Sequence, residues 1–284
     1  MPLNSVNSNL GATIALQSLN ATNSALQMTQ KHISTGYRVA DATDDGAAYA
    51  VAQRIRSDVN AITSANQQLG NIQGLLSTTN TALNNVSNLM SDARQVLVRL
   101  SDSNTQGTQR TQYIAQYKSM VSNLKSFFQD ASYSGKTLVG NINGASGFGR
   151  VAVVRNEVGS TYGIATYGGS AFMASISFTS TQLGGVSTVA AMIGTASSAT
   201  FMNKLNALGT AMATYGAAYK YVANQVSYNS DKMDALNTGL GALIDADLAK
   251  ESAKLQALQI RQQLGTQALS IANQAPQSLL SLFK

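Results

Sequence analysis

The sequence holds few of the side chains that enzymes and metal sites use. It has one histidine, His32, and no cysteine, so catalytic triads, thiolate nucleophiles and zinc sites have almost no material. Gly144, Gly147 and Gly149 form a glycine-rich turn without the lysine that follows in a phosphate-binding loop, and the HExxH pattern of zinc proteases does not occur. We therefore expect no enzyme, no cofactor and no metal, and we interpret His32 as a surface or packing residue.

Charged side chains gather between residues 38 and 58, where their chemistry is helix capping and ion pairing. Asp44 and Asp45 precede Gly46 and two alanines, which is the pattern of a helix N-terminus. The remaining charges suit either solvated pairs within the chain or ion pairs between subunits of an assembly. The candidate junction ion pairs are Arg38, Asp41, Asp44, Asp45, Arg54 and Arg56.

The overall charge and hydropathy exclude several classes of protein. The net charge is +6, but the 19 basic residues are scattered and aromatic residues are only 6% of the chain, so we expect no nucleic-acid partner. Mean hydropathy is −0.03, and no apolar run reaches the roughly 18 to 20 residues of a membrane span. We also expect no secretory signal peptide, because polar residues interrupt the N-terminal segment every few positions.

Both ends of the chain are amphipathic and nearly uncharged. The first charged side chain is Lys31, and none occurs between Arg261 and Lys284. Apolar residues recur at helical spacing in each end, namely Ala12, Leu16, Leu19, Leu26 and Ile33, and Ala253, Ala257, Ile260, Leu264, Ala268, Ile271 and Ala275. Such helices can pack on a partner without desolvating ions. The alternative is a pair of poorly ordered tails.

Two heptad patterns predict long helices. From Ile55 to Leu97 every seventh residue is apolar, and a second register follows three residues later, which predicts a helix of about 80 Å over residues 45–100. A similar run begins at Phe201 and is broken at Asn229. Each helix needs a partner for its stripe, so we expect the two to pair antiparallel with a left-handed supercoil. A shorter amphipathic helix lies between them, around residues 113–127.

Residues 131–200 have a different composition. Glycine is frequent, and the runs Val151–Val154 and Ser175–Phe178 favour strands. We expect hairpins, then a Ser/Thr-rich loop over 179–200, placed where the chain turns round at one tip of the helices. The predicted fold is mainly α: a long antiparallel helical coiled-coil rod with paired terminal helices and a small β-hairpin-containing insert.

Two segments of the sequence, one near each end, resemble a known family. ISTGYRVADATDDGAA at residues 33–48 and QALQIRQQLGTQALSIANQAPQSLLSLFK at 256–284 are similar to the signature segments of bacterial flagellin. The resemblance covers residues 1–135 and 205–284, and the short insert is like the compact flagellins of alphaproteobacteria.

The resemblance implies a filament subunit that is exported unfolded, polymerises through its terminal helices outside the cell and serves motility. It further implies three parts: an inner filament core of 1–40 with 250–284, a helical rod of 41–130 with 200–249, and a small β-rich surface insert of 131–199. The implied subunit-interface residues are Leu3, Val6, Leu10, Leu16, Leu19, Leu26, Ile33, Ile260, Leu264, Ile271, Leu279 and Leu280.

The resemblance also suggests partners. These are further copies of the chain, a flagellar export chaperone, and the cap and junction proteins of the flagellum. Family habit suggests O-glycosylation at Ser177, Thr179 or Thr181. Residues 89–98 depart from the arginine-rich segment of many flagellins, because Asp92 and Gln95 replace an arginine and a glutamate. Weak toll-like receptor recognition follows from that departure.

Three other interpretations stay open at the level of sequence. A hook–filament junction protein would share these terminal helices. A secreted enzyme using flagellin ends as an export tag would need a catalytic site in 131–200, where Glu157 is the one acidic residue and no histidine occurs. A coiled-coil adhesin or translocator would bind its target through the insert.

Overall fold

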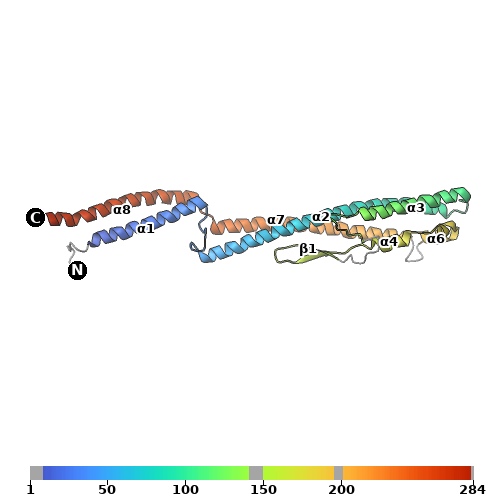
Figure 1. Cartoon of the computed structure of the whole chain (residues 1–284), viewed down its shortest axis with the longest axis horizontal. Coiled ribbons are helices and arrows are strands. Elements are labelled where there is room, and N and C mark those ends of the chain that lie inside the picture. The colour runs from blue at the N-terminus through green and yellow to red at the C-terminus, as the bar shows by residue number, and fades with distance from the viewer. Residues whose placement is uncertain (1–8, 141–149, 195–200, 283–284) are drawn as a thin grey trace. The chain divides into compact units, whose positions relative to one another are not determined.

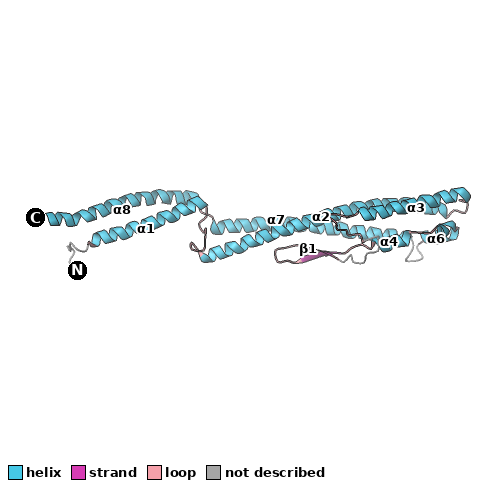
Figure 2. Cartoon of the chain, viewed as in Figure 1, coloured by secondary structure: helices cyan, strands magenta, loops and turns pink. Residues whose placement is uncertain are grey.

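The computed structural model describes residues 9–140, 150–194 and 201–282, with side chains as far as residue 274. Helices dominate, and the two strands are short (Figures 1 and 2). The elements, in chain order, are α1 Leu10–Thr35, α2 Gly46–Leu100, α3 Gly107–Asp130, β1 Val151–Val154, β2 Thr161–Ile164, α4 Gly169–Ile176, α5 Ser180–Gly184, α6 Val186–Ile193, α7 Phe201–Ile244 and α8 Leu248–Leu282. They form two compact units, residues 1–58 with 234–284 (unit 1) and residues 59–233 (unit 2).

The heptads of α2 are confirmed by burial. Of the thirteen positions in its two registers, Ile55 is half-buried and the rest are buried; they are Ile62, Leu69, Leu76, Leu83, Met90 and Leu97, and Ala65, Ile72, Thr79, Val86, Ala93 and Leu100. The helix begins where the sequence predicts, because Asp45 Oδ1 accepts the backbone N–H groups of Ala47 and Ala48 at 3.1 and 3.0 Å.

The antiparallel pairing of α2 with α7 is also confirmed. Thr63 lies beside Met233, and Asn66 accepts a hydrogen bond from Asn229 at 2.8 Å. Asn229, which interrupts the apolar register, is buried, and it also donates to the carbonyl of Arg155 at 3.0 Å. A buried polar residue with a fixed partner selects one register between two helices, because every other register would leave its amide unpaired.

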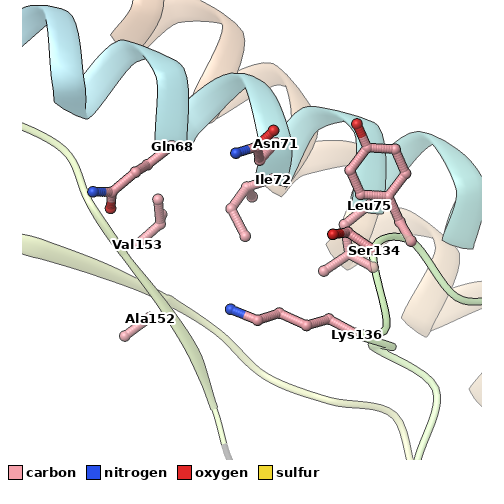
Figure 3. A pocket seen from close by; sticks show the side chains of 9 residues that line it. Gln68, Asn71, Ile72, Leu75, Ser134, Lys136, Ala152 and Val153 are labelled. Atoms are coloured by element: carbon pink, nitrogen blue, oxygen red, sulfur yellow. The ribbon is translucent and has the colours of Figure 1, made fainter.

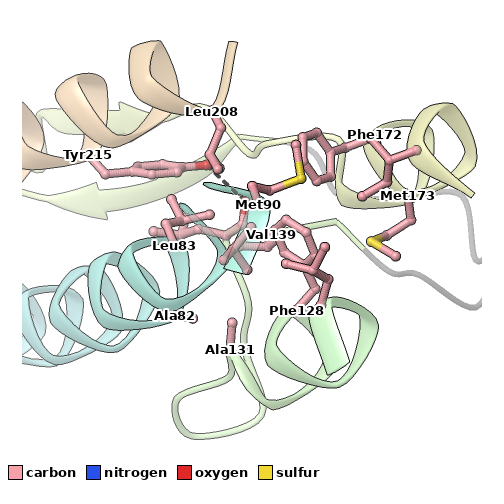
Figure 4. Close-up of a cluster of buried hydrophobic side chains, with 14 of the residues drawn as sticks. Ala82, Leu83, Met90, Phe128, Ala131, Val139, Phe172, Met173, Leu208 and Tyr215 are labelled. Atoms are coloured by element: carbon pink, nitrogen blue, oxygen red, sulfur yellow. Dashed lines mark hydrogen bonds between the residues drawn. The ribbon is translucent and has the colours of Figure 1, made fainter. Parts of the chain in front are cut away.

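The core of unit 2 joins α2, α3 and α7 with the insert (Figure 4). Phe128 of α3 meets Phe172 of α4 edge to face, with ring centroids 5.4 Å apart. Tyr117 of α3 donates its hydroxyl to the carbonyl of Ile176 at 2.7 Å, and burial raises the pKa of this phenol. Tyr215 of α7 donates to the carbonyl of Leu138 at 2.9 Å.

The insert corrects part of the sequence interpretation. The strand at Val151–Val154 is confirmed and pairs antiparallel with β2, with Val151 opposite Ile164. The strand expected at 175–178 is wrong, because α4 continues to Ile176, and the expected Ser/Thr-rich loop contains α5 and α6. Four-residue strands cannot cover the long helices, so short helices carry most of the apolar contact.

The insert is not confined to one tip of the helices, since Arg155 reaches Tyr221 and Asn229 along α7. Apolar side chains from each element of the insert lie within the main core of unit 2; they are Val153, Ile164, Phe172, Met173, Ile176, Leu183 and Val189. The insert runs beside the helices of its unit (Figure 1). It therefore completes a core that three amphipathic helices leave open on one side.

Candidate assembly interface

The terminal helices α1 and α8 pack against each other antiparallel within unit 1. Near the start of α1, Asn9 Nδ2 donates to the carbonyl of Ala272 at 2.7 Å. Further along, Gln262 Nε2 donates to Asn23 Oδ1 at 2.8 Å. Asn9 is also the N-cap of α1, since its side chain accepts the N–H of Ala12 at 3.0 Å. Uncharged amides thus align the two helices at little desolvation cost.

The two helices approach each other closely but bury few side chains along their contact, which we call the seam. At Gly265 of α8, an added Cβ would lie 3.2 Å from Leu19 Cδ1, so the absence of a side chain there permits a close approach. Only Thr29 and His32 on α1 and Leu258 on α8 are buried among the described side chains of this pair. The half-buried positions include Ala12, Leu19, Leu26 and Ile33, and Leu255, Gln262, Leu269 and Ala272.

Large apolar side chains point away from this seam on both helices. They are between 47% and 64% exposed, and they are Leu10, Ile14, Leu16 and Met28 on α1, and Ile260, Leu264 and Ile271 on α8. The last three share one helical stripe at i, i+4 and i+11. Aligned apolar side chains of this size mark a surface that packs on another molecule.

The structure divides the predicted interface residues into three groups. Leu19, Leu26 and Ile33 lie on the seam within the chain, whereas Leu10, Leu16, Ile260, Leu264 and Ile271 point outward. Leu3 and Val6 lie outside the described residues, and Leu279 and Leu280 belong to α8 with side chains that are likewise not described. The apolar stripe of α8 that is evident in the sequence is therefore not the one that faces α1.

A lysine organises the turn between α1 and α2. Lys31 Nζ lies 2.6 Å from Asp41 Oδ2 and 2.8 Å from Asp44 Oδ1. Asp44 Oδ2 also accepts the backbone N–H groups of Ala40 and Asp41 at 2.9 and 3.2 Å. We call Lys31, Asp41 and Asp44 the charged knot. It holds the chain in a tight turn that Gly36, in the left-handed conformation at φ 73°, begins.

The knot shifts the titration of its members. The hydrogen bond from Lys31 holds the pKa of Asp41 well below its usual range, with Thr43 adding further hydrogen bonds. The same lysine lowers the pKa of Asp44, and the backbone N–H of Ala40 adds to this effect. In return the two carboxylates raise the pKa of Lys31.

The other charged residues of the junction act inside the chain. Arg38 Nη2 donates to the carbonyl of Leu243 at 2.6 Å, so a cation covers the C-terminus of α7. The guanidinium of Arg56 lies over the ring of Tyr37 at 5.8 Å from its centroid. Arg54 is exposed on α2.

Sequence reasoning missed two residues of this region. Lys31 lies at the centre of the knot, and Glu251 lies 3.5 Å from His32, joining Oε1 to Nδ1. One available signal was that Lys31 and His32 are the first ionisable side chains after thirty residues without one. Glu251 is remote in sequence from residues 38–58, and Lys31 lies just before them.

A cavity of about 320 Å³ lies in unit 2 between α2, the turn at 133–136 and β1 (Figure 3). Gln68, Asn71 and Lys136 supply its polar groups, and Val153 supplies apolar surface. No acidic side chain is among its lining residues. Neutral amides with one exposed amine give no basis for assigning a cofactor here.

The described residues contain neither a metal-binding cluster nor a membrane-spanning helix. Across residues 9–140, 150–194 and 201–282, no three His, Asp or Glu side chains gather closely enough to hold a metal ion. No helix in these ranges combines the length and apolar composition that crossing a bilayer requires.

The geometry defines a class of protein: a helical coiled-coil protein whose terminal helix pair leaves an apolar face uncovered. Comparison of the sequence with known protein families gives the same class. Residues 6–144 match the bacterial flagellin N-terminal helical region, and residues 199–283 match the bacterial flagellin C-terminal helical region. The chain therefore belongs to the bacterial flagellin family.

Relatives of full length support the assignment. Flagellin FljM of Caulobacter vibrioides is 33% identical over 100% of both chains, and a flagellin of Brucella melitensis is 35% identical over 99% of both. Flagellin C of Rhizobium meliloti is 29% identical over 99% of this chain and 100% of its own.

A solved structure shares the fold. A putative flagellar hook-associated protein from Vibrio parahaemolyticus covers 71% of this chain and 100% of its own, at 16% identity and a TM-score of 0.53. The family matches and the full-length relatives make the chain a structural, non-enzymatic subunit of the extracellular flagellar filament, where it serves motility.

Proposed function

We propose that this subunit polymerises through the outward apolar face of its terminal helix pair. The exposed stripe of Ile260, Leu264 and Ile271 on α8 carries the proposal. On a monomer this stripe contacts water along three turns of helix or more. In a filament, neighbouring copies of α1 and α8 would cover it.

The charge pattern supports the same proposal. Residues 1–30 and 262–283 hold no ionisable side chain, so packing them against copies of themselves desolvates no ion. Burying one exposed leucine or isoleucine contributes about 1.5–3 kcal/mol. A few such residues per subunit, repeated along a lattice, supply a sizeable driving force for assembly.

Electron microscopy of the purified chain after seeding or salt-induced polymerisation tests the proposal. We expect long filaments from the natural chain and none from the triple variant Ile260→Ser, Leu264→Ser, Ile271→Ser. A truncation lacking residues 265–284 should also stay monomeric, since it removes Ile271 and the later turns of α8.

The matched control keeps the outward apolar stripe and changes exposed polar side chains on a flank of α8. Gln259, Thr266 and Asn273 are exposed and recur every seven residues, at least about a quarter of a turn away from the apolar stripe, and their replacement by serine should leave filament formation intact. Filaments from the apolar triple variant, or their equal loss in the flank control, would contradict the proposal. Short rings from the natural chain would favour a junction protein.

We further propose the three-part arrangement in the filament: 1–40 with 250–284 in the inner core, 41–130 with 200–249 as the rod, and 131–199 at the surface. The outward stripe on α8 supports the first part, and the buried heptads of α2 support the second. Cryo-electron microscopy of the filament tests it. A terminal helix pair at the outer radius would overturn it.

Ion pairs between subunits remain a proposal for the junction. Arg38, Asp41, Asp44, Asp45 and Arg56 already have contacts within the chain. Arg54, which is exposed, is therefore the residue we propose to meet a carboxylate of a neighbouring copy. Arg54→Gln should weaken filaments at low salt, make their stability less dependent on salt concentration, and leave the monomer's melting temperature unchanged; unchanged filaments would refute this.

O-glycosylation is proposed at Thr181. The hydroxyl of Ser177 donates to the carbonyl of Met173 at 2.7 Å, and that of Thr179 caps α5 by accepting the N–H of Gln182. Thr181 is exposed on α5, which favours modification there over the other two. Intact mass spectrometry of native filaments checks it, and an unmodified mass of 29.7 kDa would refute it.

Weak toll-like receptor recognition is also proposed, because Asp92 and Gln95 are exposed on α2 in place of an arginine and a glutamate of many flagellins. A reporter-cell assay showing nanomolar potency would overturn it.

An export chaperone and the cap and junction proteins are proposed partners by family resemblance. Co-purification from cells, with and without residues 265–284, tests these partners, and equal recovery would exclude the terminal helix as their site.

A further inference from the structure

The one histidine of the chain faces a carboxylate across the seam of α1 and α8. His32 lies in the last turn of α1 and is 6% exposed. Its Nδ1 lies 3.5 Å from Oε1 of Glu251, which belongs to the first turn of α8 and has a side chain 14% exposed. The pair therefore joins the end of one terminal helix to the beginning of the other, largely away from water.

The polar atoms here are incompletely paired. Thr29 Oγ1, His32 Nδ1 and Glu251 Oε2 are buried without a hydrogen-bond partner in the described structure. Leaving such atoms unpaired is unfavourable, since each has lost its water. A neutral imidazole offers the carboxylate no charge, whichever nitrogen carries the proton. The protonated ring has N–H donors on both nitrogens and a positive charge, so its Nδ1 can donate a charge-assisted hydrogen bond to Oε1 of Glu251.

The backbone around His32 and the charged groups near it complete the surroundings of the pair. The C-terminus of α1 carries the negative end of the helix dipole, and the N–H of Gly36 binds the carbonyl of His32 at 2.9 Å. Other charged groups of the elements that meet here are Lys31 on α1, Asp41 and Asp44 in the turn, and Asp247, Lys250 and Lys254 at the start of α8. Lys31 is engaged by the charged knot, and Lys254 Nζ lies 3.6 Å from Glu251 Oε2.

We propose that His32 and Glu251 form a proton-operated brace that tightens the α1·α8 pair as pH falls from about 8 to about 5.5. Imidazole ordinarily gains its proton within this interval. The chain has one histidine and no cysteine, so no other side chain ordinarily titrates there. The brace lies within one chain and does not depend on polymerisation through the outward face.

Hydrogen–deuterium exchange of the full-length monomer, read by mass spectrometry, tests the brace. The peptides of interest cover the last turns of α1 and the first turns of α8, at pH 8 and pH 5.5. At pH 5.5 we expect these amides to be about fivefold better protected in the natural chain than in His32→Gln or Glu251→Gln, as a charge-assisted hydrogen bond predicts. At pH 8 the difference should shrink to within about twofold. Comparing chains at the same pH cancels the intrinsic exchange rate.

The control and a second variant keep the test decisive. Lys254→Gln removes the other cation beside Glu251 and should leave the pH-dependent difference in place, and the double variant His32→Gln, Glu251→Gln should be no worse than either single one. An equal loss of protection at both pH values would overturn the brace and leave a packing role. A pH step that survives Glu251→Gln, or disappears in Lys254→Gln, would overturn it too.

Discussion

The α1·α8 pair and the core of unit 2 are built from helices of the same kind but finish their packing differently. In unit 2, α2 buries all twelve of its heptad positions, and nine of them belong to the core shared with α3, α7 and the insert. In the terminal pair, one apolar residue of α8, Leu258, is buried among the described side chains, while Ile260, Leu264 and Ile271 point outward.

The difference shows which part of the subunit can be stable alone. Unit 2 buries the apolar stripe of α2 within its own core, as an independently stable domain does. The terminal pair leaves surface that only another molecule can cover, and it is held by amide contacts such as Asn23 with Gln262 and by the charged knot. We expect substitutions to act on stability in unit 2 and on assembly in the terminal pair.

The largest expected effect on monomer stability comes from the core of unit 2. Leu97 is fully buried on α2, so Leu97→Ala should lower the free energy of unfolding by about 2–5 kcal/mol through lost transfer energy and a cavity. Chemical denaturation followed by circular dichroism measures it. A loss below about 1 kcal/mol would mean that the core is looser than its burial indicates.

A buried amide gives the next effect. Asn229→Ala removes the donor to Asn66 and to the carbonyl of Arg155, so we expect a loss of about 1–3 kcal/mol in the same assay. Asn23→Ala removes the comparable amide contact with Gln262 on the terminal pair and is the control. Equal losses from the two variants would break the comparison between the regions.

Acid should loosen the charged knot before the rod. The pKa values of Asp41 and Asp44 are lowered in the folded chain, so their contribution is present above the ordinary carboxyl pKa of about 4 and is lost as pH falls through the lowered values. We expect the protection of the amides of residues 31–45 against hydrogen exchange to fall between pH 4 and pH 2. This effect should be smaller than the loss of stability that Leu97→Ala and Asn229→Ala cause in unit 2. In Asp44→Asn the amides of residues 31–45 should exchange fast already at pH 6. If their protection were unchanged, the charged knot would not be what holds this turn.

The smallest expected effect on monomer stability comes from Leu264→Ala, and it compares the terminal pair with unit 2 most directly. Leu264→Ala makes the same chemical change as Leu97→Ala, but on a side chain that is 64% exposed, so the free energy of unfolding should change by less than about 0.5 kcal/mol. Filament yield, measured by sedimentation, should nevertheless fall. A stable monomer with normal filament yield would show that this face is not covered by assembly.

The heptads made most of the helical fold predictable. An unbroken seven-residue apolar period from Ile62 to Leu97 has no other good arrangement than a long helix with a partner, and Asp45 marks its start by capping chemistry. The insert was less predictable, because short apolar runs fit strands and helices equally well. The run at 175–178 was placed in a strand for its local composition, yet contacts with Tyr117 hold it at the end of α4.

The candidate interface was predictable in part. The sequence shows an apolar stripe on α8, but not whether it faces α1 or another molecule. Gly265 marks the face of α8 that meets α1. Because this residue has no side chain, α8 can approach Leu19 of α1 closely there. Periodicity alone cannot rank two faces of one helix, whereas a close backbone approach can.

The sequence by itself determined the helical class, the antiparallel pairing of the long helices, the uncharged ends and the family, because these depend on composition and on local periods. Only the tertiary structure decided which face of α8 stays open, that Lys31 ties Asp41 to Asp44, and that His32 meets Glu251. Those contacts join residues that are distant in the chain or lie on different elements. Their distances depend on how the helices pack, and no local pattern of residues encodes that.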